Sequence, residues 1–128
     1  MTTLADLTPN FRSVRLLLAR DKDHPAGERD AGYDILVPLD KDGRLIPEEW
    51  KSHQEFCRVR HFDPDQNDRI GRLRRKPGGQ WYFDYEEGTS DDEIGFRFAD
   101  ERFVIGEYVS VKHAGDEHTY QVARVEKP

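Results

Sequence analysis

The chain has 128 residues, of which 35% are hydrophobic and 36% charged, and its formal net charge is -6. This length suits one domain over residues 1–128, with residues 1–10 expected as a mobile tail. The negative charge argues against general affinity for nucleic-acid phosphates. No apolar run approaches the roughly 18 residues that a membrane helix requires. One cysteine cannot form an intrachain disulfide, so we expect a soluble protein of the reducing cytoplasm.

The first half of the chain predicts three strands and one helix. Residues Val14–Arg20 form an apolar run typical of a buried strand, and the polar residues 21–31 read as a loop. Apolar and polar residues alternate over Tyr33–Leu39, which predicts a second strand that ends near Pro38. Residues Pro47–Gln54 predict a short helix, because proline suits the first helical position. A third strand is expected over 56–62.

The segment Arg69–Glu86 predicts a hairpin around Pro77-Gly78-Gly79. A three-residue loop with glycine last suits a tight turn closed by a left-handed residue. The resulting register places Leu73 opposite Phe83 and Arg75 opposite Trp81. A two-residue loop would scramble the apolar and polar faces, so this register is preferred.

The C-terminal part predicts short strands around Phe96 and Phe98 and a final hairpin over residues 103–125. Two alternative loops both place His113 opposite His118. Many short strands and a single helix predict a mainly β fold, namely a small antiparallel β-barrel or sandwich.

Three segments resemble a family of small bacterial proteins with no assigned activity. They are GYDILVPLDKDGR (Gly32–Arg44), FDYEEGTSDDEIGFRF (Phe83–Phe98) and GEYVSVKHAGDEHTYQVARV (Gly106–Val125). The resemblance runs through most of the chain. It implies no catalytic, cofactor-binding or partner-binding residue.

Charge is distributed unevenly along the chain. Residues Phe56–Lys76 carry seven cations against three acids, whereas Asp84–Glu101 carry eight acids against one cation. Arginine beside aromatic rings can hold an anion and stack on planar groups. The predicted ligand-binding residues are therefore those of the central hairpin: Arg72, Arg74, Arg75, Trp81 and Tyr82. The alternative is that these arginines pair within the hairpin, for example Arg72 with Asp84.

Three other clusters were considered for metal binding or catalysis. His113 and His118 could share a metal, but two nitrogens without further ligands do not make a zinc site. Cys57 could act as a nucleophile beside His61, but no protease signature surrounds it, and a buried structural cysteine is the simpler interpretation. The acidic segment Ser90–Glu93 is more typical of a solvated loop than of an acid–base pair.

The sequence thus predicts a non-enzymatic binding module that takes a small anionic ligand or a protein partner. No metal, cofactor, membrane or nucleic-acid partner is predicted. A homodimer, in which the basic strand of one copy meets the acidic segment of another, stays open. The alternative function is a metal-dependent or hydrolytic enzyme that uses some of the histidines and acids.

Overall fold

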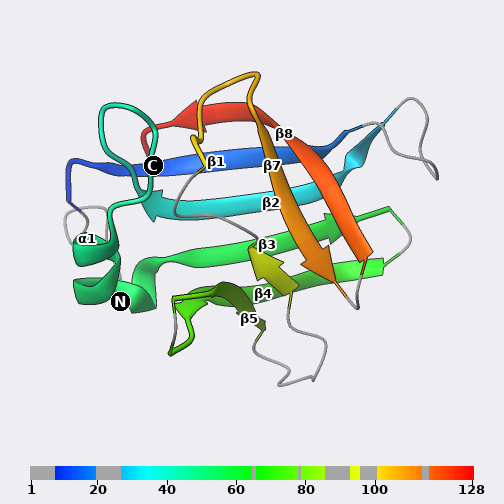
Figure 1. Ribbon diagram of the computed structural model, residues 1–128. Helices are drawn as coiled ribbons and strands as arrows, with labels where there is room; N and C mark the ends of the chain where they lie inside the picture. Colours follow the sequence, from blue (N-terminus) through cyan, green and yellow to red (C-terminus); the bar gives the residue numbers. More distant parts are fainter. Residues whose placement is uncertain are drawn as a thin grey trace.

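The protein is a closed antiparallel β-barrel, which confirms the predicted mainly β fold (Figure 1). The computed structural model describes residues 8–19, 27–64, 66–77, 79–85, 93–95, 101–113 and 116–128. Successive strands are neighbours around the barrel, and the last strand pairs with the first. The elements are β1 (Phe11–Leu18), β2 (Glu28–Pro38), α1 (Pro47–Ser52), the 3-10 turn η2 (Gln54–Phe56), β3 (Arg58–Asp63), β4 (Gln66–Arg75), β5 (Trp81–Tyr85), β6 (Glu93–Gly95), β7 (Tyr108–His113) and β8 (Asp116–Glu126).

The core fills the inside of the barrel. The strands alternate buried and more exposed residues, and in β5 the buried ones are Trp81, Phe83 and Tyr85. Aromatic rings meet at the centre, where Tyr33 lies 5.1 Å from Phe83 and 5.0 Å from Tyr120, measured between ring centroids. An eight-stranded barrel is just wide enough for side chains to fill it. Large rings therefore compensate for the modest hydrophobic content of the chain.

Gly71 lets β4 and β5 curve closely past each other. A Cβ atom built on Gly71 would lie 2.3 Å from the backbone oxygen of Asp84. No side chain fits in that space. Glycine is therefore required where β4 passes close to the backbone of Asp84 and of Tyr85, which lies opposite Gly71 across the sheet.

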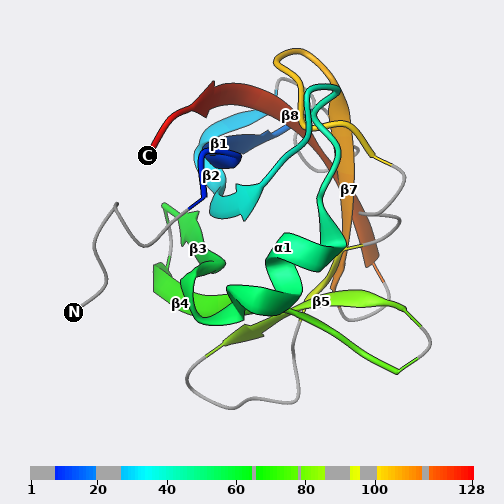
Figure 2. The ribbon, with the colours of Figure 1, turned by 90° about the vertical axis from the view of Figure 1, so that its left-hand side faces the viewer.

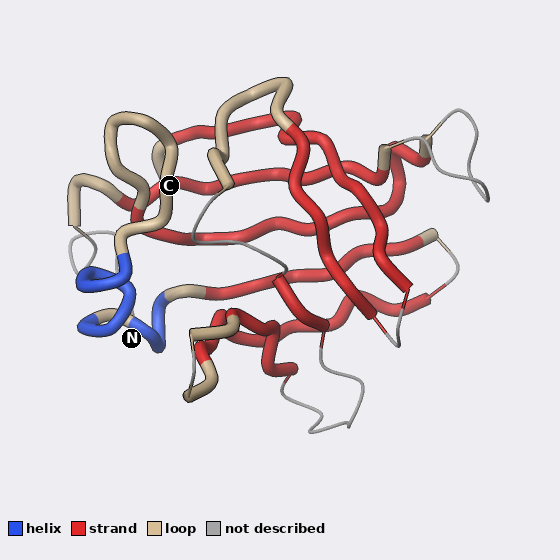
Figure 3. Tube along the Cα trace, viewed as in Figure 1, coloured by secondary structure: helices blue, strands red, loops and turns tan. Residues whose placement is uncertain are grey.

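Helix α1 lies across one mouth of the barrel, as the view along the barrel shows (Figure 2). Among the described residues, helical ones occur only at this end of the barrel (Figure 3). Trp50 is 7% exposed and packs edge-on against Trp81, with ring centroids 4.7 Å apart. Its indole nitrogen donates a hydrogen bond to the carbonyl oxygen of Leu73 at 2.8 Å. The helix thus plugs the mouth with one aromatic side chain.

The predicted register of the central hairpin is confirmed. Leu73 lies opposite Phe83, and Arg75 lies opposite Trp81. The Lys76 and Gln80 ends are tied by a hydrogen bond from the Lys76 N–H to the Gln80 carbonyl oxygen at 2.8 Å. The loop length and the apolar alternation therefore identified this pairing correctly.

The predicted register of the last hairpin is wrong by two residues. Val111, not His113, lies opposite His118, and His113 lies opposite Asp116. A shift of two residues leaves every side chain on the same face of the sheet. The inward positions Val109 and Tyr120 are consequently buried as expected, although their partners differ.

Other boundaries differ by a few residues from those expected. Strand β1 begins three residues earlier than predicted, at Phe11, because this ring is buried against His53 at 5.8 Å between ring centroids. Strand β2 begins within the predicted loop, at Glu28. Residues 1–7 of the predicted tail, and the predicted strands around Phe96 and Phe98, lie outside the described residues. Residues 8–10 make backbone contacts, among them a hydrogen bond from Leu39 to Asn10 at 2.9 Å.

Candidate functional site

The structure divides the five predicted ligand-binding residues between the two faces of the barrel wall. Arg72, Arg74 and Tyr82 point outward, whereas Trp81 points inward and is 2% exposed. Arg75 shares the inward face and lies at the end of the hairpin, with its guanidinium carbon 5.1 Å from the centroid of the Trp81 ring. Trp81 therefore belongs to the core, whereas Arg75, at the end of the hairpin, is exposed to solvent.

Arg74 has several polar partners on the outer face. Its guanidinium group contacts Glu55 at 3.3 Å, Gln54 at 3.3 Å and Asp84 at 3.7 Å. Arg72 lies opposite Asp84 across the sheet, and its guanidinium group lies 4.0 Å from the carboxylate of Glu55. The side chain of Glu55 is 72% exposed, so its two contacts are those of a solvent-screened ion pair.

Arg58 adds an uncompensated positive charge to this face. It lies directly opposite Arg72 on the neighbouring strand, and like charges in such positions destabilise a sheet. Arg58 is exposed and makes no ion pair with any acid in the part of the chain that the structure describes. The exposed Arg58 thus leaves a local need for negative charge beside Arg72.

A shallow hollow of about 250 Å³ lies beside Arg58 on the outer surface. Its walls include the apolar side chains of Leu36 and Ile70, and Ile70 is 37% exposed. Ser13 also lines the hollow. An apolar depression next to a free guanidinium group suits an acidic group attached to an apolar one.

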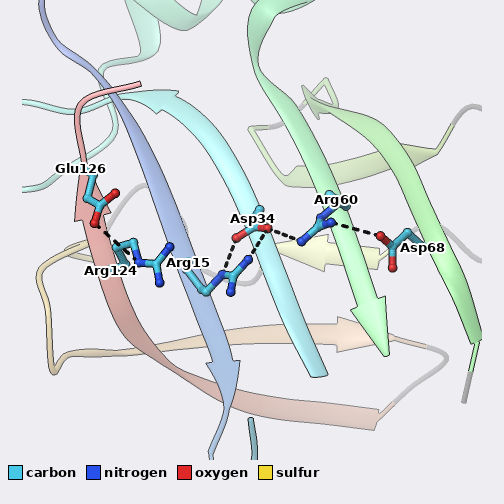
Figure 4. A network of polar contacts seen from close by, with 6 residues as sticks. All are labelled: Arg15, Asp34, Arg60, Asp68, Arg124 and Glu126. Atoms are coloured by element: carbon cyan, nitrogen blue, oxygen red, sulfur yellow. Dashed lines mark hydrogen bonds and ion pairs between the residues drawn. The ribbon is translucent and has the colours of Figure 1, made fainter. Parts of the chain in front are cut away.

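The neighbouring row of outward residues is electrically balanced. The carboxylate of Asp34 bridges Arg15 at 2.8 Å and Arg60 at 2.7 Å, and Arg60 also contacts Asp68 at 3.1 Å (Figure 4). Burial works to raise the pKa of Asp34, but hydrogen bonds and attraction from both arginines outweigh it and lower that pKa. The row therefore holds the barrel wall together and offers no unpaired charge for a ligand.

The only cysteine is buried and poorly suited to catalysis. Cys57 is fully buried, and burial raises the pKa of its thiol to about 12, although the charge of Arg74 opposes this. A thiol with such a pKa is protonated at neutral pH and is a weak nucleophile. The interpretation of Cys57 as a structural residue fits this environment.

The predicted histidine and acid clusters do not form a metal site in the described residues. His61 stacks on Tyr33 at 4.5 Å between ring centroids, on the inner side of the wall. No group of three histidine, cysteine or acidic side chains within the described ranges could hold a metal ion. The side chain of His113 and most of the acidic segment Ser90–Glu93 lie outside the described residues, so their predicted roles are still predictions.

Comparisons with known proteins add no relative to this picture. Neither family models, nor curated proteins, nor solved structures give a match to the chain. The resemblance to a family of small bacterial proteins stays a prediction from the sequence. Within the described residues, no helix has the length and apolar character needed to cross a membrane.

The sequence already contained the signal that separates Trp81 from Tyr82. Neighbouring residues of a strand point to opposite faces, so these two rings cannot share one surface. The predicted register also placed Trp81 on the same face as Leu73 and Phe83, which is the core face. The position of Arg58 opposite Arg72 could not be predicted in this way, because it depends on the pairing of β3 with β4.

Proposed function

We propose that the chain is a binding module whose outer β3–β5 face takes an acidic segment of a protein partner. We call this surface the basic face, and its residues are Arg58, Ile70, Arg72, Arg74 and Tyr82. The observation that carries the proposal is the opposition of Arg58 and Arg72 on adjacent strands. A carboxylate placed between them would relieve their repulsion and form charge-assisted hydrogen bonds.

Glu55 is a weakly held internal partner of the basic face. Glu55 is largely exposed, and its contacts with Arg72 and Arg74 are 4.0 and 3.3 Å long. Such ion pairs contribute about 0–1 kcal/mol. A carboxylate of the partner can therefore replace Glu55 at little cost. The exposed Ile70 and the hollow beside it add apolar contact next to the charge.

The inside of the barrel supports this choice of the outer face. Its centre is occupied by aromatic side chains such as Tyr33, Phe83 and Tyr120, which are buried and in contact with one another. A ligand inside would have to displace this core. The net charge of -6 opposes long-range attraction of an acidic partner, so we expect modest affinity that depends on contacts at short range. The single buried Cys57 fits action in the reducing cytoplasm.

The test uses a fluorescent peptide of alternating glutamate and leucine, together with a control peptide in which glutamine replaces each glutamate. Fluorescence anisotropy measures the Kd of both at low salt and at about 500 mM salt. We expect the acidic peptide to bind the wild-type protein and the glutamine peptide to bind at least about tenfold more weakly. Added salt should weaken binding of the acidic peptide.

Two variants locate the binding. Arg58→Glu should weaken binding of the acidic peptide about tenfold or more, because it replaces the unpaired cation with an acid. Arg124→Glu is the matched control, since Arg124 is 54% exposed and lies on β8, away from the basic face. Equal losses in the two variants, or equal binding of the two peptides, would show that the basic face is not a specific site. Light scattering in the same buffers detects self-association, which would redirect the proposal to a second copy as the partner.

A further inference from the structure

A second hollow, of about 350 Å³, lies at the barrel mouth that α1 plugs, between two loops that are far apart in the sequence. One loop follows β2 and includes Leu39 and Gly43, and the other precedes β7 and includes Phe103 and Val104. Val125 of β8 completes the apolar wall. Its volume is within the range of small-molecule sites, and it is separate from the basic face.

The two loops are held in fixed positions. The N–H of Phe103 donates to the carbonyl oxygen of Gly43 at 2.7 Å, and the side chain of Arg102 donates to the carbonyl oxygen of Asp42 at 3.2 Å. A Cβ atom on Gly43 would lie 2.7 Å from a methyl carbon of Val104, so the loops interlock closely. The hollow therefore exists before a ligand arrives, which lowers the entropic cost of binding.

The rim carries an exposed isoleucine on a rigid turn. Ile105 is 63% exposed. It precedes Gly106, which has a φ of 95°, and the turn is closed by a hydrogen bond from Glu107 to Val104 at 2.9 Å. Gly106 also donates to the carbonyl oxygen of Val122 at 2.9 Å, which ties the turn to β8. The turn thus holds an apolar side chain at the edge of the hollow at the cost of exposing it to water.

Among the charged residues that line the hollow, Arg12 has a guanidinium group that can still bind an anion. Arg12 is partly buried and lines the hollow. Its Nη1 atom donates to the carbonyl oxygens of Pro9 and Phe11, both at 2.8 Å, and no ion pair with an acid is made by Arg12 in the described parts of the chain. Two further lining residues, Asp40 and Lys41, have opposite charges.

Asp40 is already occupied within its own turn. Its Oδ1 atom accepts hydrogen bonds from the backbone N–H groups of Asp42 at 2.8 Å and Arg44 at 3.0 Å. These backbone hydrogen bonds, with that from Arg44 the largest, lower the pKa of the carboxyl group. Since Lys41 offsets the charge of Asp40, the hollow as a whole is positive by the charge of Arg12. It combines apolar walls with one cation.

We propose that this hollow is a binding site for a small apolar monocarboxylate, whose carboxylate contacts Arg12 and whose apolar body lies against Phe103, Val104 and Ile105. Arginine binds carboxylates through paired N–H donors, and the free edge of the Arg12 guanidinium group supplies them. The apolar body covers the exposed surface of Ile105 and gains hydrophobic free energy. A cationic or neutral analogue of the same shape cannot form the carboxylate contact with Arg12 and keeps only the apolar contact.

The test uses benzoate as the probe, with benzyl alcohol and benzylamine as neutral and cationic analogues. Amide chemical shifts in NMR titrations of the whole chain report both the site and the Kd. We expect benzoate to shift the amides of Phe103 to Glu107 and of Lys41 to Gly43. Benzyl alcohol should bind about tenfold more weakly or worse, because a charge-assisted contact is lost.

Two variants and one control make the test specific. Arg12→Gln should reduce benzoate affinity about tenfold or more. Arg44→Gln changes an exposed arginine of the loop after β2 that does not line the hollow, and it should leave the affinity unchanged. If Arg12→Gln fails to fold, Ile105→Glu serves in its place. This change sits on an exposed turn and should abolish binding by placing a carboxylate in the hollow.

The outcomes separate this site from the basic face. Shifts confined to the hollow, lost in Arg12→Gln and retained in Arg58→Glu, support the proposal. The proposal is overturned if about 20 mM benzoate causes no shifts, since a Kd near that concentration is about the weakest that a useful small-molecule site would show. Equal affinity for benzoate and benzyl alcohol also overturns it, and so do shifts around Arg58 alone. The presence or absence of shifts in the hollow does not bear on binding of the acidic peptide to the basic face.

Discussion

The two buried tryptophans offer a matched test of the way the core and the helical plug are built. Trp50 and Trp81 are 7% and 2% exposed and pack against each other. The indole N–H of Trp50 donates to the carbonyl oxygen of Leu73 at 2.8 Å. The indole N–H of Trp81 is also buried, but it has no acceptor within the described part of the chain. Substitution by phenylalanine therefore removes a hydrogen bond in one case and a buried unsatisfied donor in the other.

The expected costs follow from this difference. Each Trp→Phe change loses part of a packed ring, at about 1–2 kcal/mol. Trp50→Phe also leaves the Leu73 carbonyl oxygen without its donor, which adds about 1–3 kcal/mol. Trp81→Phe instead removes a donor that was costly to bury, which offsets much of the lost packing. We expect Trp50→Phe to be the less stable variant by about 2 kcal/mol.

The assay is urea unfolding followed by fluorescence, which suits both variants because each keeps one of the two tryptophans. Free energies of unfolding come from linear extrapolation, and equal slopes show that the variants expose similar surface on unfolding. As a control for folding, the circular dichroism spectra of both variants should match that of the wild type. A Trp81→Phe variant as unstable as Trp50→Phe, or less stable, would refute the reasoning.

Three further predictions concern other parts of the barrel. Asp34→Asn should destabilise the protein by about 1 kcal/mol at pH 7. The pKa of Asp34 is lowered in the folded state, so its stabilising contribution is fully present above its pKa in the unfolded chain, about 3.9, and is lost as the pH falls through the folded pKa. In urea unfolding, the stabilities of the variant and the wild type should therefore converge in acid. Cys57 should react with iodoacetamide at pH 7.5 at least about 100-fold more slowly in the folded protein than in urea, since burial raises the pKa of its thiol to about 12. Rapid labelling of the native protein would contradict this burial. Gly71→Ala should cost about 3 kcal/mol in thermal or urea unfolding, because the added methyl group meets a backbone oxygen at 2.3 Å, and a near-neutral effect would mean that the wall relaxes there.

The two hairpins show what the sequence could and could not determine about the fold. In the central hairpin, the loop Pro77–Gly79 and the alternation of apolar residues required the same register, so Leu73 was correctly paired with Phe83. In the last hairpin the alternation was equally clear, but it is unchanged by a shift of two residues. Nothing in the sequence distinguished the pairing of His118 with His113 from the observed pairing with Val111.

The candidate sites were less predictable because each depends on contacts between distant parts of the chain. The local pattern identified the arginines of β4, and the structure places Arg72 and Arg74 on the outer face. It did not reveal that Arg58 of β3 lies opposite Arg72. The hollow at Arg12 was even harder to predict from the sequence, since its walls come from residues near 40, 104 and 125, which only the closed barrel brings together.

The seam between β1 and β8 has a consequence for how the protein folds. Every other pairing joins strands that are consecutive in the chain, whereas Ser13 pairs with Glu126 across nearly the whole described sequence. Seven ladders can therefore form as local hairpins, and one closure bears the entropy of a long loop, which grows only with the logarithm of its length. High contact order slows folding, and here it is concentrated in a single ladder. Joining β8 to β1 by a short linker and opening the chain at another hairpin would move that slow closure to a chosen pair of strands, and the folding rate of each permuted chain would then report how readily that pair comes together.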